Sequence, residues 1–138
     1  MNKRKMYTDQ VIYLITIFAF YSAMAVYITL CIKGNTMLRV VVLTPLMGGL
    51  ASTLYCMKAV YVHSIKLKSH DAKYDMWIYL RPYVGTGRGL IAGFIYALLY
   101  VFSSGKTHKT WLILLFFIWA FIEGYRPMLT RFMDKNND

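Results

Sequence analysis

Four long apolar segments, separated by short polar stretches, dominate the hydrophobic pattern of this chain. Their approximate bounds are residues 10–32, 38–65, 82–102 and 110–129. An α-helix rises about 1.5 Å per residue, so about 20 apolar residues cross a hydrocarbon core that is about 30 Å thick. Each segment reaches that length. The pattern therefore predicts an all-α fold, an integral membrane four-helix bundle in which residues 1–138 form a single transmembrane domain.

The connections between the segments predict how the helices follow one another. Residues 33–36 form a short turn that contains Gly and Asn, which makes the second helix antiparallel to the first. Residues 66–81 are the long connection. They are polar at first and then rich in Trp and Tyr, which prefer the level of the lipid headgroups. We expect this stretch to be an interfacial loop on the cytoplasmic side.

A helix kink is predicted in the second segment. Proline removes one backbone hydrogen bond and clashes with the preceding turn of a helix. Pro45 lies inside the segment, and Gly48 and Gly49 follow about one turn later. We expect the helix to bend at these three residues.

The first segment also allows a second interpretation, a cleaved signal peptide. Residues 11–22 would form its apolar core, and Ala23-Met24-Ala25 fits the small-x-small pattern of a cleavage site. The apolar run continues without a polar break through Leu30, however, so a membrane-spanning helix is favoured.

Composition supports a membrane protein and sets its orientation. The chain is 58% hydrophobic, against about 45–50% for soluble domains, and its net charge is +10. The positive side chains lie at the ends of the apolar segments, where lipid headgroups would meet them, so no nucleic-acid partner is expected. Eleven Lys and Arg belong to the N-terminus, the long connection through Arg88 and the C-terminus, against four on the two short loops. This asymmetry predicts cytoplasmic N- and C-termini.

The clearest local motif is a glycine series in the third segment. Gly85, Gly89 and Gly93 are spaced by four and stack on one helical face, and Ala97 continues the series. Small residues in this spacing let a second helix approach closely in lipid. Two interpretations stay open: packing against another helix of the same chain, and packing between the subunits of a homo-oligomer.

Charged residues near the cytoplasmic boundary form a second candidate group. Its members are Lys58, Arg81, Arg88, Glu123 and Arg126. A charge at membrane depth is costly unless it is paired, and Glu123 is the only carboxylate within the four segments. The favoured interpretation is a structural pair of Glu123 with Arg126, Arg88 or Lys58. The alternative is a proton- or cation-coupling carboxylate.

No pattern in the chain indicates catalysis or a metal site. His63, His70 and His108 are scattered, and Cys31 and Cys56 lie in separate apolar segments without a C-x-x-C spacing. No nucleophile has an acid–base partner at a recognisable spacing. We therefore expect no enzyme activity, no metal and no cofactor.

Part of the chain resembles small, mostly uncharacterised bacterial inner-membrane proteins of four helices. The resemblance rests on an aromatic-x-R-P-x-x-G motif at residues 79–85, followed by Gly89, and on residues 121–125. In those proteins the first motif opens one span and a G-F-x-E-like motif closes the next, whereas here Glu123 precedes Gly124. The resemblance covers about the C-terminal 55 of 138 residues and implies a multi-pass protein of the bacterial inner membrane.

These features favour a non-enzymatic, oligomeric integral membrane protein. The more specific hypothesis is a pore-forming or membrane-disturbing effector. The glycine series and the small size support this hypothesis. The alternatives are an accessory subunit of a larger membrane complex, which would dock through the basic loop, and a small dimeric transporter that uses Glu123.

Overall fold

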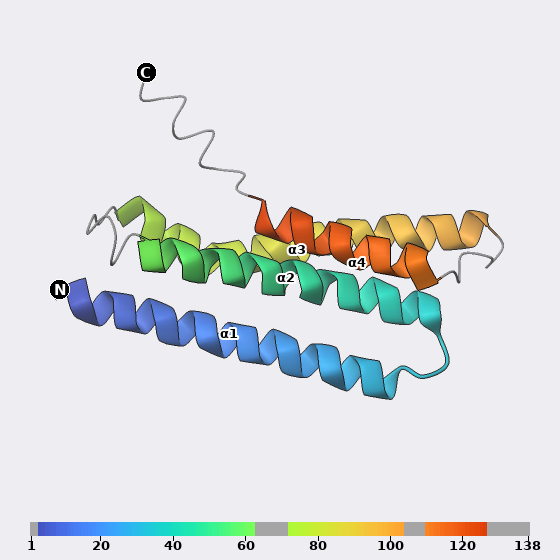
Figure 1. The fold of residues 1–138 in the computed structure, drawn as a ribbon, viewed down its shortest axis with the longest axis horizontal. Helices are drawn as coiled ribbons and strands as arrows, with labels where there is room; N and C mark the ends of the chain where they lie inside the picture. Colours follow the sequence, from blue (N-terminus) through green and yellow to red (C-terminus); the bar gives the residue numbers. More distant parts are fainter. Residues whose placement is uncertain (1–2, 63–71, 104–109, 127–138) are drawn as a thin grey trace, which may run out of the picture.

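The structure is a computed structural model, and it describes residues 3–62, 72–103 and 110–126. These residues form four helices, α1 (Lys3–Cys31), α2 (Thr36–Tyr61), α3 (Ala72–Phe102) and α4 (Thr110–Tyr125), which run alternately in opposite directions (Figure 1). The all-α prediction is confirmed. Three segments, Tyr7–Cys31, Thr36–Tyr61 and Met76–Phe102, are long and apolar enough to cross a membrane, and α4 is apolar but shorter. The orientation of the termini stays a prediction.

The third helix begins earlier than its sequence predicts. Residues 72–81 were expected to belong to an interfacial loop, but they are the first ten residues of α3. Proline suits a first helical turn, which is why the start was placed at Pro82, yet the helix continues through it. Tertiary packing explains the difference. Ile78 is buried in an apolar cluster with Leu14 of α1 and Cys56 of α2, and this contact holds the additional turns in place.

α2 is the central helix of the molecule. It lies between α1 on one side and α3 with α4 on the other, as Figure 1 shows. In the most apolar window of α2, 44% of the residues are buried, against 17% for α1, so α1 is the peripheral helix. Leu14, Tyr21 and Ile28 are the buried apolar residues of α1, and their spacing of seven places them on one face. The bundle is therefore a three-helix core with a fourth helix attached along α2.

Two apolar clusters lie toward opposite ends of the bundle. One joins Val40 of α2 to Tyr96 of α3 and Phe116 of α4, near the short α1–α2 turn. The other joins Leu14 of α1 to Val60 of α2 and Ile78 of α3, near the opposite end. The layer between them contains few large side chains, and it is where α2, α3 and α4 approach each other most closely.

The turn between α1 and α2 is held by side-chain hydrogen bonds. The Asn35 side chain accepts a hydrogen bond from the Leu38 backbone N–H at 3.0 Å, which caps the start of α2. The Arg39 guanidinium donates to the Ile32 carbonyl through Nε at 2.8 Å and through Nη2. These bonds satisfy backbone groups that a helix end leaves unpaired, and they fix α2 antiparallel to α1.

Candidate functional site

The predicted glycine series of α3 packs against α2 of the same chain. A Cβ atom at Gly89 would come within 2.9 Å of Pro45 Cα and closer still to the Thr44 carbonyl oxygen. At Gly85 it would meet the Gly48 carbonyl, and at Gly93 it would meet Thr44. The backbones of α2 and α3 are thus in direct contact. We refer to this contact as the glycine seam, formed by Gly85, Gly89 and Gly93 on α3 and by Thr44, Gly48 and Ser52 on α2.

The residues of α2 that form the seam were not predicted, although their spacing is visible in the sequence. Thr44, Gly48, Ser52 and Cys56 are small, buried and spaced by four, as the glycines of α3 are. The sequence predicted that Gly48 and Gly49 take part in a kink at Pro45. In the structure α2 is one helix across Pro45, and Gly48 is a contact point that faces both α3 and Gly124 of α4. The kink itself stays a prediction.

Gly49 lies against a different helix, the peripheral helix α1. A Cβ there would lie 2.7 Å from Tyr21 Cζ and from Thr86 Oγ1. The Tyr21 hydroxyl and Thr86 Oγ1 are 2.7 Å apart, and Thr86 donates its own proton to the Pro82 carbonyl at 2.9 Å. Tyr21 is therefore the donor to Thr86. The missing side chain of Gly49 leaves the space through which Tyr21 of α1 reaches α3.

Arg81 lies on the same face of α3 as the glycines of the seam and carries a buried charge. It precedes Gly85 by four positions, and only 4% of its surface is exposed. The centre of its guanidinium lies 3.6 Å from the ring centroid of Tyr55, and its Nη2 donates to the Arg126 carbonyl at 2.9 Å. Ser52 Oγ donates to the Arg81 carbonyl at 2.7 Å, which fixes α3 on α2 at this level. A cation–π contact and a carbonyl acceptor together compensate for part of the lost hydration.

Arg88 and Arg81 converge on the C-terminal end of α4. Arg88 Nη1 donates to the Glu123 carbonyl at 2.9 Å and to the Arg126 carbonyl at 3.3 Å. The last carbonyls of a helix have no intrahelical donors and carry partial negative charge. Two arginines of α3 therefore cap α4. We call Arg81, Arg88 and Arg126, together with Glu123, the arginine cluster.

Glu123 belongs to this cluster through Arg126, one of the three partners that the sequence predicted for its carboxylate. Its carboxylate pairs with Arg126 at 3.3 Å on the surface of α4, where the Arg126 side chain is 69% exposed. An exposed pair of this kind contributes about 0–1 kcal/mol. The link between α3 and α4 uses the backbone carbonyl of Glu123 instead of its carboxylate. Lys58 is exposed and lines a hollow on α2 with Tyr55, Ala59 and Val62.

The remaining predicted residues take no part in a polar site among the described residues. Ala97 is half-buried on α3. Cys31 is exposed, Cys56 is buried, and both are free thiols. No group of three potential metal ligands occurs in the part of the chain that the structure describes. The three histidines lie outside that part, so the absence of a metal site stays a prediction.

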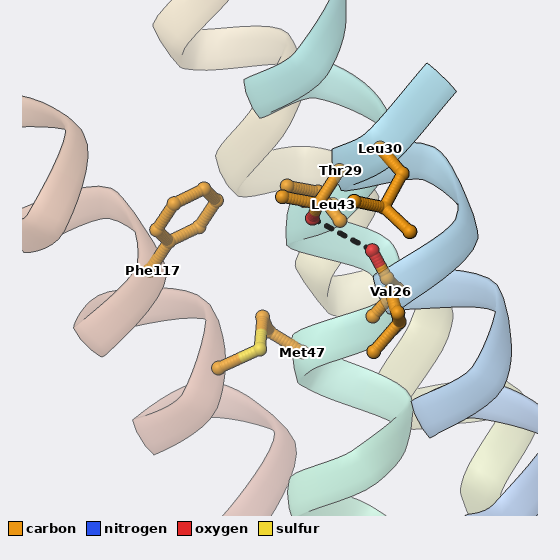
Figure 2. Close-up of a pocket in the computed structure, with 7 residues that line it drawn as sticks. Val26, Thr29, Leu30, Leu43, Met47 and Phe117 are labelled. Carbon is orange, nitrogen blue, oxygen red and sulfur yellow. Dashed lines mark hydrogen bonds between the residues drawn. The ribbon is translucent and has the colours of Figure 1, made fainter. Parts of the chain in front are cut away.

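A groove separates α1 from α4. Figure 2 shows Val26, Thr29 and Leu30 of α1 opposite Phe117 of α4, with Met47 of α2 between them. The cavity has a volume of about 290 Å³. Its wall is apolar, because the Thr29 hydroxyl donates to the Ala25 carbonyl of its own helix at 2.7 Å. We call this cavity the α1–α4 groove.

No family model, curated protein or solved structure matches this chain. The resemblance to small bacterial membrane proteins therefore stays a prediction. In the structure, its aromatic-x-R-P-x-x-G motif has a packing role: Arg81 caps α4, Pro82 is buried, and Gly85 touches α2.

Proposed function

We propose that this chain is a non-enzymatic integral membrane protein that crosses the bilayer four times and acts by lateral association with further copies of itself. The small-residue faces of α2 and α3 are used within one chain, because the glycine seam brings their backbones into contact. They leave no room for the backbone of a second copy. The surface for self-association must therefore lie elsewhere.

The proposal rests on an outward-facing row of residues on α1. Six exposed residues of α1 are spaced by four, and the two at the centre are small. We call them the α1 stripe: Val11, Ile15, Ala19, Ala23, Tyr27 and Cys31. Ala19 and Ala23, at the centre of the stripe, lie opposite the face that α1 buries against α2. In lipid, a small-x-x-x-small pair on an exposed face lets a second helix approach closely and gain van der Waals contact.

The α1–α4 groove adjoins this surface. Val26 and Leu30 line the groove and are 61% and 62% exposed. They join the groove to the stripe, because Tyr27 and Cys31 follow them directly in the sequence. A partner that packs on the stripe can insert an apolar side chain into the groove. Because the glycine seam is closed, any aqueous path in such an oligomer would lie between chains. The carboxylate of Glu123 is paired with Arg126 and gives no support to a coupling role.

Cysteine cross-linking in native membranes tests the proposal. The exposed Cys31 is replaced by serine, and a single cysteine is introduced by Ala23→Cys on the stripe. The matched control is Phe94→Cys on α3, where Phe94 is 59% exposed. The buried Cys56 stays in both variants.

Mild oxidation should give a covalent dimer from the Ala23→Cys variant and much less from the Phe94→Cys variant. The close approach of two stripes brings the Ala23 positions together, whereas α3 faces lipid there. Equal yields from both positions would mean random collision in the membrane. No dimer from the Ala23→Cys variant would refute association through the stripe.

A further inference from the structure

The arginine cluster carries more positive charge than its described neighbours balance. Arg81, Arg88 and Arg126 meet at the end of α4, where the Glu123 carboxylate pairs with Arg126 and is the one carboxylate in contact with them among the described residues. The described side chains therefore leave two positive charges unmatched. The C-terminal end of α4 adds only about half a negative charge through its dipole. A charge that is removed from water is costly unless it is paired, so this excess favours a bound anion.

The cluster also lies inside the length of the bundle. Arg81 stacks on the ring of Tyr55, which is six positions before the end of α2 at Tyr61. At 1.5 Å per residue this is about 9 Å along the helix axis. Gly124 packs against Gly48, so α4 ends nearer the middle of α2, as Figure 1 shows. Ionisable groups at such depth are costly unless they are paired.

A second observation points to an occupant. Arg81 Nε is buried and has no hydrogen-bond partner among the residues that the structure describes. A cavity of about 10 Å³ lies among Arg81, Arg88, Arg126, Trp77 and Ser52. This volume holds about one oxygen-sized group. The cavity can thus accept one oxygen of a larger anion whose remaining atoms lie outside, beside the exposed Arg126 side chain.

We propose that the arginine cluster binds one phosphate group and that an anionic phospholipid headgroup supplies it. Guanidinium groups present paired N–H donors that match the spacing of phosphate oxygens. One phosphate oxygen enters the small cavity toward Arg81, and the others accept hydrogen bonds from Arg88 and Arg126. The phosphate compensates for the excess charge. Its lipid tails stay in the surrounding bilayer.

The test uses the full chain in nanodiscs of phosphatidylcholine, with and without a fraction of phosphatidylglycerol. The variant is Arg126→Gln, which removes an exposed charge but leaves the Arg126 backbone carbonyl that Arg81 needs. The matched control is Lys58→Gln, which removes one charge from an exposed position of α2. Thermal unfolding and native mass spectrometry report stability and bound lipid. A third arm adds inorganic phosphate to phosphatidylcholine nanodiscs.

Phosphatidylglycerol should raise the unfolding temperature of the wild type and of Lys58→Gln, and it should remain bound in both. In Arg126→Gln its apparent affinity should fall by about tenfold or more, since a charged hydrogen bond is lost. The same effect with inorganic phosphate alone would support the phosphate site but replace the lipid by a soluble anion.

Two outcomes would overturn the proposal. Equal losses in Arg126→Gln and Lys58→Gln would mean general attraction between a basic protein and anionic lipid. Retained lipid binding in Arg126→Gln would remove the arginine cluster from lipid recognition. Arg88→Gln, in which a capping group is lost, serves as a second variant and should lose bound lipid at temperatures where it remains folded.

Discussion

Gly89→Ala is the most direct perturbation of the glycine seam. The added methyl group would collide with the Thr44 carbonyl and would lie 2.9 Å from Pro45 Cα. Both neighbours are backbone, so no side chain can rotate away to make room. The α2 and α3 helices must separate locally, and contacts along the seam must loosen with them. Gly87, two residues earlier on the same helix, has nothing within 4 Å of its Cβ position.

The two glycines allow the magnitude to be worked out as a difference. Replacing glycine by alanine in a helix interior gains about 1 kcal/mol at either position. Overpacking at a tight contact costs about 1–3 kcal/mol, and a backbone contact belongs at the upper end of that range. We therefore expect Gly87→Ala to be neutral or stabilising and Gly89→Ala to destabilise by about 1–2 kcal/mol. Gly89→Leu should exceed this loss.

The assay is reversible unfolding of the purified chain in detergent or bicelles, with both alanine variants measured in one series. The difference in unfolding free energy between Gly89→Ala and Gly87→Ala isolates the cost of the contact, because the propensity gain cancels. A difference near zero would show that α3 does not touch α2 through Gly89. The glycine seam would then not be the contact that holds α3 on α2.

Three further predictions concern single contacts and orientation. Tyr21→Phe removes the hydrogen bond to Thr86 and should lower the unfolding free energy by about 0.5–1.5 kcal/mol, without changing the helix content measured by circular dichroism. Glu123→Gln should change stability by less than about 1 kcal/mol, since the pair is exposed and the backbone carbonyl keeps its bond to Arg88. A loss of pH-dependent ion flux in proteoliposomes with an intact fold would instead favour the coupling role. Reporter fusions should read outside at Asn35 and inside after Asp138, and the reverse would contradict the charge asymmetry.

The sequence predicts the helices well because their length and apolar character are local properties. The short turn at Asn35 was also predicted, since Gly and Asn there favour reversal of the chain. The start of α3 was not predicted. Residues 72–81 are helical because Ile78 is buried against α1 and α2, and this contact is not visible in the local sequence. Contacts between distant helices decided that boundary.

The partners of each face were harder to predict than the faces themselves. The spacing of Gly85, Gly89 and Gly93 indicates a close helix contact but carries no information on which helix makes it. Gly48 was attributed to a kink because Pro45 is nearby, although its spacing with Thr44 and Ser52 matches that of the α3 glycines. The Arg81 and Arg88 contacts with α4 depend on where α4 ends relative to α3, which no local pattern encodes.

The proposed self-association is tested most directly by counting subunits in discs of native membrane. Mass measurement of single discs would compare the wild type with Ala23→Leu, a change at an exposed position of the α1 stripe that leaves the core untouched. We predict at least two chains per disc for the wild type. The variant should give one chain with an unchanged unfolding temperature, since leucine keeps a second α1 at a distance. A wild type that is monomeric at every expression level would contradict the account.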